Sequence, residues 1–125
     1  MTMKTSKRKL GDLGEELACG FLNSLGQRVL ERNWRTGHLE VDIIAASADG
    51  LHFVEVKSRT APLSADPLSS VTLTKMKRMS AAALSYVRER RMPQTEMFFD
   101  LITVVFNGGR AEINHYPQAF LPNIY

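Results

Sequence analysis

The sequence predicts a single α/β domain in which a central mixed sheet of about five strands is flanked by two helices. The 125 residues are 44% hydrophobic and 23% charged. This is the composition of one globular domain that can bury a core without disulfides or a structural metal. The spacing of apolar residues changes along the chain in the order helix, three strands, helix, two strands. A sheet with one helix packed on each side is the simplest arrangement that buries this pattern.

The first half of the chain supplies one helix and three strands. Apolar residues recur at helical spacing from Leu10 to Leu25, and Gly26 ends the pattern. Residues 1–9 hold four cations and little to bury, which predicts a mobile basic arm. Alternating apolar residues and intervening turn signals then predict strands over residues 29–34, 39–46 and 51–58.

The second half of the chain supplies one helix and two strands. Apolar residues at helical spacing, Met79 and Ala83 among them, predict a helix over residues 71–91 that Pro93 closes. The β-branched and aromatic run over residues 98–106 predicts a buried strand. A turn at Asn107-Gly-Gly109 then leads into a last strand over residues 110–116.

Composition also excludes several classes of protein. Lys and Arg number 16 against 13 Asp and Glu, which favours an anionic partner without identifying it. The single cysteine, Cys19, excludes a disulfide framework and a cysteine-based zinc site. The sequence has no apolar run near the ~20 residues of a membrane span and no signal peptide. These features predict a soluble cytoplasmic protein without a membrane partner.

Carboxylates on the two middle strands carry the main functional signal. A tight turn after Ala46 sets Asp42 opposite Glu55. The same register sets Glu40 opposite Lys57, provided that no bulge shifts it. Because like charges directly opposed repel, the Asp42–Glu55 pair is favourable when a divalent cation such as Mg²⁺ lies between the carboxylates. The alternative is an ordinary cross-strand ion-pair ladder on a wet face, in which Lys57 pairs with Glu40 or Glu55.

The first helix adds a further carboxylate. At 100° per residue, Glu15 borders the apolar stripe, so we expect it to lean over the sheet edge. Glu16 points away from that stripe, and we expect it to face water.

Three segments of the chain resemble the signature of the bacterial YraN family: Gly14-Glu15, Glu40-Val-Asp-Ile-Ile44 and Phe53-Val-Glu-Val-Lys-Ser-Arg59. That family is placed with the restriction-endonuclease-like, or PD-(D/E)XK, nucleases. Within this superfamily the chain is also similar to the archaeal Holliday-junction resolvases. The resemblance runs from the first helix to Val105 and includes Asn33 and the Phe99-Asp100 pair. It implies a restriction-endonuclease-like core and a Mg²⁺ or Mn²⁺ cofactor.

The resemblance also implies roles for individual residues. Asp42 and Glu55 match the metal-binding carboxylates, and the Val56 carbonyl is a further ligand. Lys57 matches the lysine that orients or activates the attacking water. Glu15 matches an additional helix carboxylate of resolvase-like members, near the metal. Such a set suffices for metal-assisted phosphodiester hydrolysis, and the neighbouring carboxylates are expected to keep Lys57 protonated.

Two positions depart from the family pattern. Leu39 stands where a glycine is expected before Glu40, which would alter the backbone at the entrance of the site. Phe98 stands where an arginine often precedes the Phe-Asp pair, which removes a candidate substrate contact. Glu40 itself matches a family glutamate, which we place just outside the metal ligands.

Basic residues near the candidate site predict a track for phosphates. Lys75, Lys77 and Arg78 open the second helix, and Arg59 leaves the strand that carries Glu55. Contacts of this kind give affinity without sequence information. We therefore expect these four residues to bind nucleic acid, whereas the cations at the end of the second helix are equally well interpreted as a solvated face.

Three functions are consistent with the sequence. The leading hypothesis is a Mg²⁺- or Mn²⁺-dependent endonuclease that acts on branched or structured DNA, as a homodimer if it follows the resolvases. The second is a nucleic-acid-binding module that acts with a partner and cuts slowly or not at all. The third is an interaction domain whose apolar tail, residues 120–125, contacts a partner or a second copy.

Overall fold

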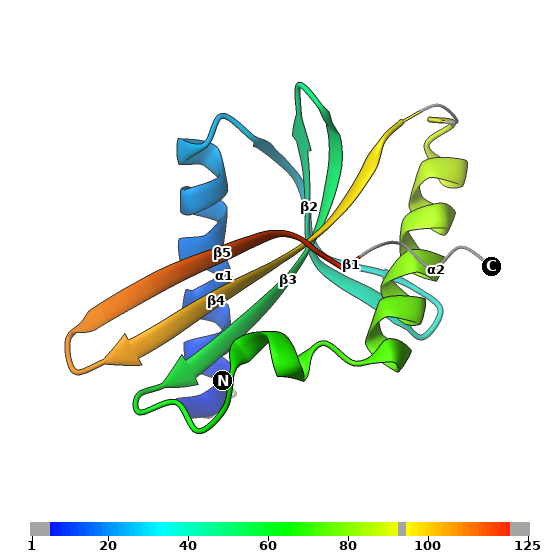
Figure 1. Cartoon of the computed structure of the whole chain (residues 1–125). Helices are drawn as coiled ribbons and strands as arrows, with labels where there is room; N and C mark the ends of the chain where they lie inside the picture. The colour runs from blue at the N-terminus through cyan, green and yellow to red at the C-terminus, as the bar shows by residue number, and fades with distance from the viewer. Residues whose placement is uncertain (1–5, 93–94, 121–125) are drawn as a thin grey trace, which may run out of the picture.

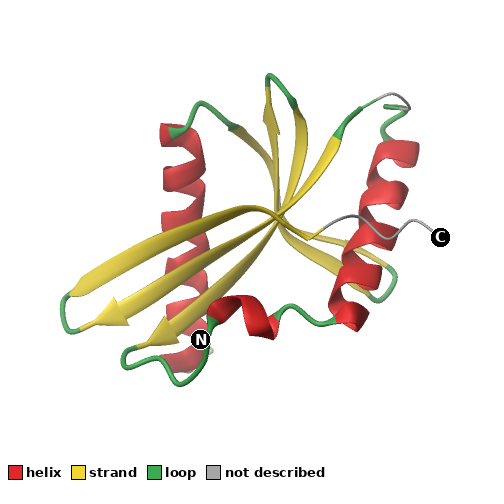
Figure 2. Cartoon of the chain, in the orientation of Figure 1, coloured by secondary structure: helices red, strands yellow, loops and turns green. Residues whose placement is uncertain are grey.

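The computed structural model describes residues 6–92 and 95–120. In chain order the elements are α1 (Ser6–Ser24), β1 (Arg28–Thr36), β2 (Leu39–Ser47), β3 (Gly50–Thr60), the short 3₁₀ helix η1 (Pro67–Ser70), α2 (Leu73–Glu89), β4 (Met97–Asn107) and β5 (Arg110–Phe120) (Figure 1). Figure 2 shows α1 and α2 on opposite sides of the strongly twisted sheet. The predicted α/β class, a mixed five-stranded sheet with two flanking helices, is confirmed.

The five strands form one sheet in the order β1-β2-β3-β4-β5. Neighbouring strands are antiparallel except for β3 and β4, which run parallel. A parallel pair needs a crossover connection, commonly a helix, and the segment that contains η1 and α2 supplies it. Strand β4 therefore lies inside the sheet, and its residues 99–105 are buried, as the β-branched run predicts.

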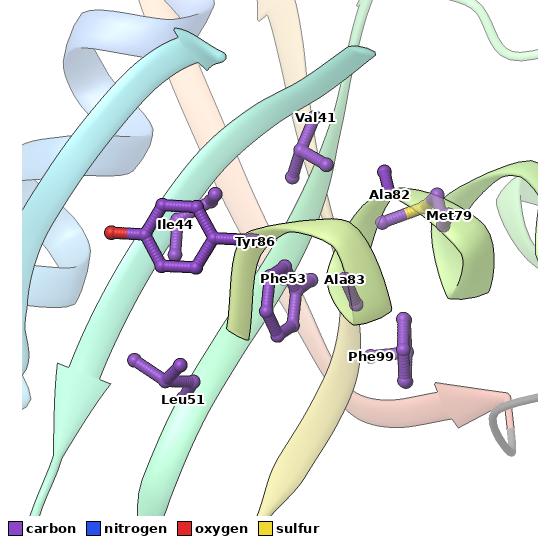
Figure 3. Close-up of a cluster of buried hydrophobic side chains, with 9 residues drawn as sticks. All are labelled: Val41, Ile44, Leu51, Phe53, Met79, Ala82, Ala83, Tyr86 and Phe99. Carbon is purple, nitrogen blue, oxygen red and sulfur yellow. The ribbon is translucent and has the colours of Figure 1, made fainter. Parts of the chain in front are cut away.

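Each face of the sheet packs against one helix. The cluster on the α2 face comprises Val41, Ile44, Leu51, Phe53, Met79, Ala82, Ala83, Tyr86 and Phe99 (Figure 3). The cluster on the α1 face comprises Ala18, Leu22, Ile43, Ala45, Val54, Ile102 and Val104. Because Phe53 packs toward α2 and Val54 toward α1, alternation along β3 carries Glu55 and Lys57 to the α2 face.

The helices differ from the predicted ones at their ends. Helix α1 begins at Ser6, so residues 6–9 are helical and do not belong to an arm; residues 1–5 lie outside the described residues. Its apolar stripe is narrower than predicted, because Leu13 and Leu25 are 45% and 51% exposed. Helix α2 begins later than predicted, after Thr72, whose side chain accepts a hydrogen bond from the Lys75 backbone N–H.

The C-terminal strand is longer than predicted. It passes Tyr116 and continues to Phe120 beyond an irregularity in the β4–β5 pairing. Pro93 and tail residues 121–125, for which we predict a helix stop and a partner contact, lie outside the described residues. Neither of the long helices in the described part of the chain has the length and apolar character needed to cross a membrane.

Candidate functional site

Strands β2 and β3 separate at the level of Asp42 and Glu55. Their pairing follows the predicted register from the hairpin turn to the Ile43–Val54 pair and ends there. Beyond this point β2 remains paired with β1, and β3 remains paired with β4. Asp42 and Glu55 therefore follow the last pair instead of forming a direct cross-strand pair, which corrects the predicted arrangement. We call this opening the fork; in Figure 1 the end of β3 runs away from the β1–β2 turn.

A reversal of the pleat in β1 accompanies the fork. Asn33 has a φ of 51°, in the left-handed region that asparagine tolerates better than most residues. Arg32 and Trp34 flank it and face opposite sides of the sheet, although residues two apart normally share a face. Arg32 lies 3.9 Å from Glu15 of α1, whereas Trp34 packs edge-on against Tyr86 of α2.

Strand β2 makes the same reversal across Asp42. Val41 packs in the α2 cluster and Ile43 packs in the α1 cluster. The Asp42 carboxylate turns toward β3, where its Oδ2 accepts a hydrogen bond of 2.8 Å from the Val56 backbone N–H. The Asp42 side chain thus replaces the backbone hydrogen bond that β2 would make to β3 if the two strands were still paired. It connects β2 to β3 through the Val56 amide at the point where they separate.

The surroundings of Asp42 are unfavourable for an unaccompanied anion. Burial raises the pKa of Asp42 to about 7, the Val56 N–H opposes this, and Glu55, Glu15 and Glu40 add to the rise. Several carboxylates around a partly buried one favour the uptake of a proton or a cation. Oxygen ligands of this kind suit Mg²⁺ or Mn²⁺.

Glu55 faces α2, where Lys75 Nζ lies 2.7 Å from its Oε1. Burial acts to lower the pKa of Lys75, but the hydrogen bonds to Glu55 and Lys57 outweigh it and raise that pKa. The ion-pair alternative paired Lys57 with Glu40 or Glu55. In the structure Glu55 forms its ion pair with Lys75, and Glu40 lies 3.4 Å from Arg35. Neither carboxylate is therefore paired with Lys57 in the way that this alternative expected. Sequence reasoning assigned Lys75 only to phosphate binding, because its contact with Glu55 depends on how α2 docks.

Lys57 lies beside Lys75 and holds its proton less tightly than a free lysine. Burial first, and then the hydrogen bond and the charge of Lys75, lower the pKa of Lys57 to about 8, against the smaller upward effect of Glu55. The lowered pKa weakens the expected hold of Lys57 on its proton, and at neutral pH the group stays mostly protonated. Lys57 therefore loses its proton more readily than a free lysine, and a neutral amine can accept a proton.

Glu15 approaches the fork from the α1 face. Its side chain is 17% exposed, and Oε1 has no hydrogen-bond partner among the described residues. Burial raises the pKa of Glu15, while the Asn33 hydrogen bond and the Arg32 charge oppose the rise. The predicted placement is confirmed, since Glu15 borders the buried face and Glu16 is exposed. The part of Glu15 in metal binding stays a prediction.

A cavity of about 280 Å³ opens at the fork, and we call it the fork cavity. Its lining includes the carboxylates of Glu40, Asp42 and Glu55 together with the cations of Lys75 and Arg78. Of the other predicted residues, Lys57 and Arg59 line a neighbouring cavity, and Lys77 is exposed on α2. Leu39, which departs from the family pattern, also lines the fork cavity.

A second polar cluster lies at the opposite end of β3 and β4. Asp100 is fully buried, and its oxygens lie 2.8 Å from His52 Nδ1 and 3.7 Å from His115 Nε2. It also accepts a hydrogen bond from the Gln118 backbone N–H at 2.9 Å. Phe98, the other departure from the family pattern, stacks on His52 with ring centroids 4.9 Å apart. This cluster fastens β5 to the sheet and contributes nothing to the fork.

Comparison with known proteins places the chain in a family. The model of the uncharacterised protein family UPF0102 matches residues 14–104, a span that contains every carboxylate and lysine of the fork. The chain belongs to the UPF0102 family. This confirms the YraN-like resemblance at the level of the family.

Relatives of similar length support this assignment. A UPF0102 protein of Bacteroides thetaiotaomicron is 39% identical over 117 residues, which cover 94% of this chain and 96% of the relative. A UPF0102 protein of Myxococcus xanthus is 40% identical over 114 residues, which cover 91% and 90%. Among solved structures, that of Pyrococcus furiosus SfsA in complex with Ca²⁺ has a TM-score of 0.38 and 12% identity, over 89% of this chain and 63% of SfsA.

Proposed function

We propose that this UPF0102 protein is a divalent-cation-dependent nuclease that hydrolyses phosphodiester bonds in DNA. The observation that carries the proposal is the fork, which gathers Asp42, Glu55 and Lys75 around one cavity beside Lys57. Neighbouring carboxylates that can hold a cation, with a lysine beside them, suit metal-assisted phosphodiester hydrolysis.

The donor chemistry at the fork suits a divalent cation, although the described residues hold no group of three or more acidic, histidine or cysteine side chains already placed around one metal position. Asp42 and Glu55 would hold it, with the Val56 carbonyl as a further oxygen ligand and Glu15 approaching from the α1 face. Two observations support the fit. Burial and neighbouring carboxylates raise the pKa of Asp42 to about 7. The buried Glu15 Oε1 accepts no hydrogen bond from the described residues, and its ion-pair contact with Arg32 spans 3.9 Å. When bound, the cation supplies electrostatic stabilisation of the phosphate and lowers the pKa of water.

The chain's own residues divide the remaining work. Lys57, with its pKa lowered to about 8, can exchange a proton with water or with the leaving oxygen near neutral pH. Lys75 carries a firmly held positive charge at the wall of the fork cavity, where it can orient a phosphate. Asp42 keeps β2 and β3 at a fixed separation through the Val56 N–H, so the geometry of the site is set before substrate arrives.

Cations around the fork favour a polyanionic substrate. Arg78 lines the fork cavity and Arg59 lines the neighbouring one, and Lys77 is exposed beside Arg78. Such residues bind the phosphate backbone without reading base sequence. We therefore propose DNA as the substrate and branched or structured DNA as the first form to test.

The test is a cleavage assay with branched, flapped, single-stranded and duplex DNA in Mn²⁺ and in Mg²⁺. Asp42→Asn keeps an acceptor for the Val56 N–H but removes the charge, and we expect it to lower cleavage by at least about 100-fold. The matched control is Glu16→Gln, an exposed carboxylate on α1, which should cleave like the wild type. Undiminished cleavage by Asp42→Asn would refute the assigned site.

One observation favours the second function, a DNA-binding module that does not cut. Lys75 already neutralises Glu55 through a contact of 2.7 Å, and an ammonium group at this position competes with a metal cation for the carboxylate. If this competition prevails, DNA binds in a salt-sensitive manner while calorimetric titration with Mn²⁺ gives no saturable heat. Metal-dependent cleavage of any DNA would exclude this alternative.

A further inference from the structure

A second cavity, of about 240 Å³, lies beside the fork under the segment that links β3 to α2. We call it the loop cavity. Lys57 and Arg59 of β3 line it together with Thr103 of β4, and Pro62 and Leu63 of the linking segment cover it. Lys57 and Thr103 are register partners on the parallel strands, so they stand side by side on the α2 face of the sheet.

Thr103 is an unsatisfied polar residue at the wall of the loop cavity. Thr103 is 1% exposed, and its hydroxyl has no hydrogen-bond partner among the described residues. Two other hydroxyls in the lining are already used, since Ser69 Oγ donates to the Asp66 carbonyl and Ser70 Oγ donates to the Pro67 carbonyl. A buried hydroxyl without a partner is costly, so a ligand that reaches Thr103 from the cavity would gain a hydrogen bond with it.

The rest of the lining defines the chemistry of such a ligand. Pro62, Leu63 and Val105 supply apolar surface, and Lys57 and Arg59 supply positive charge. Asp66 also lines the cavity, and its carboxylate accepts a hydrogen bond from the Leu68 backbone N–H. A volume of 240 Å³ corresponds to about eight water molecules, which is the scale of one nucleobase. A flat, largely apolar group with a polar edge and an attached phosphate satisfies all three features.

We propose that the loop cavity binds one unpaired nucleotide next to the phosphate held at the fork. The inference rests on the proposed function and narrows its substrate to DNA with at least one unstacked base beside the cleaved bond. Lys57 follows Glu55 by two residues, a separation of about 6.6 Å along a strand that a single nucleotide of an unstacked chain can span. A base bound in the cavity has to lie outside the base stack, so it cannot be paired with another strand at the same time.

The test measures binding without cleavage, by NMR titration of the ¹⁵N-labelled full chain in chelator. The probes are deoxyadenosine 5′-monophosphate, deoxyribose 5-phosphate and inorganic phosphate. We expect the nucleotide to shift the amides of Thr60, Ser69 and Thr103 saturably, and to bind at least fivefold more tightly than either probe without a base. Equal affinity for all three probes, or no saturable shift of these amides, would overturn the proposal.

Variants identify the cavity as the binding site. Thr103→Val keeps the shape and removes the unpartnered hydroxyl, so it should fold and should weaken nucleotide binding about fivefold or more. Thr74→Val, an exposed threonine of α2, is the matched control. Ala65→Phe, on the exposed covering segment, places a larger side chain at the wall of the cavity and should abolish the shifts. Unchanged binding by both cavity variants would contradict the assignment.

The two proposals can fail separately. Base-dependent binding at the loop cavity in a protein that cuts no DNA would refute the nuclease and leave the nucleotide site standing. Conversely, Mn²⁺-dependent cleavage with no base-dependent binding would support the nuclease and refute the nucleotide site.

Discussion

Asp42 serves two purposes with one carboxylate, and its ionisation is coupled to folding. It anchors the Val56 N–H at the fork, while burial and the nearby Glu55, Glu15 and Glu40 raise its pKa from 3.8 to about 7. The folded protein therefore binds this proton more tightly than the unfolded chain. By linkage, the contribution of Asp42 to the free energy of unfolding falls as the pH rises from about 4 to about 7, and it stays low above that range.

This linkage makes Asp42→Asn a stabilising change at alkaline pH. In chelator at pH 8 we expect the free energy of unfolding of the variant to exceed that of the wild type by about 2 kcal/mol. This value is smaller than the full pKa shift implies, because solvent reaches part of the side chain. At pH 5 the folded carboxyl is largely protonated but the unfolded one is already ionised, so the gap should be smaller, at about 40% of its value at pH 8. Urea unfolding at both pH values measures the gap, and a gap that does not grow with pH would contradict the raised pKa.

Lys75 acts at the residue scale as an internal counter-ion for Glu55. Because its ammonium group competes for the carboxylate at 2.7 Å, Lys75→Met should bind Mn²⁺ roughly fivefold more tightly, the equivalent of about 1 kcal/mol. The matched control is Lys77→Met, which removes the same charge from an exposed position on α2. Isothermal titration calorimetry with Mn²⁺ measures the affinity of both variants. An equal gain in affinity in both would mean that only the net charge of the protein matters.

At the scale of elements, the docking of α1 on β3 depends on Gly14. A Cβ at Gly14 would collide with Ser58 Oγ and lie 3.1 Å from Ser58 Cβ, so only glycine permits this approach of helix and strand. Glu15 follows directly and is carried toward the fork by the same approach. Packing, rather than backbone freedom, therefore explains the Gly14-Glu15 pair.

Gly14→Ala should destabilise the protein by about 2 kcal/mol, because overpacking forces the helix away from the sheet. Gly20→Ala is the matched control: a Cβ there meets nothing within 4 Å, and alanine in a helix should stabilise by about 0.5–1 kcal/mol. Ser58→Gly in the Gly14→Ala background should recover part of the loss. Thermal unfolding of the three variants measures these differences, and equal effects at Gly14 and Gly20 would rule out the steric explanation.

The sequence predicts the element order well and the fork poorly. Alternation and turn residues suffice for the hairpin register as far as Ile43 and Val54, since each strand there has one face toward each helix. The same assumption of continuous alternation fails at Asn33 and Asp42, where the pleat reverses. A signal was present, because asparagine within a strand pattern tolerates a positive φ.

Other features of the site lie beyond local sequence patterns. The Glu55–Lys75 contact joins a strand to a helix across the crossover, and its existence depends on how α2 docks on the sheet. The apolar stripe of α1 is narrower than predicted for a related reason, since Leu13 and Leu25 are apolar yet exposed. The sequence predicts which helix or strand carries each candidate residue. It does not predict which side chain on another element that residue contacts.

At the scale of the whole molecule, the modest excess of 16 basic over 13 acidic residues conceals an uneven distribution. Acidic groups converge at the fork, so the remaining surface is more basic than the net charge indicates. Arg78 lines the fork cavity, whereas Arg90, at the end of α2, is held 3.0 Å from Glu31 and stacks over Tyr86. The two ends of α2 therefore differ in the availability of their positive charge.

This difference predicts the salt dependence of DNA binding. Arg78→Gln should lower the slope of log K against log salt by about 1, the value for one lost phosphate contact. Arg90→Gln removes the same charge from a residue already paired with Glu31, and its slope should match the wild type. Fluorescence anisotropy over a range of salt concentrations gives both slopes. Equal reductions would place the DNA on the whole length of α2 instead of at the fork.

The hydrogen bond between Asp42 and Val56 also gives the fork a built-in spectroscopic reporter. Beyond the last β2–β3 pair, the Val56 amide proton bonds to a side chain that can itself gain a proton or ligate a cation. Its chemical shift and its rate of exchange with solvent are therefore set by the state of one carboxylate. A single backbone resonance can follow, in the unmodified protein, whether Asp42 is protonated, ionised or occupied by metal.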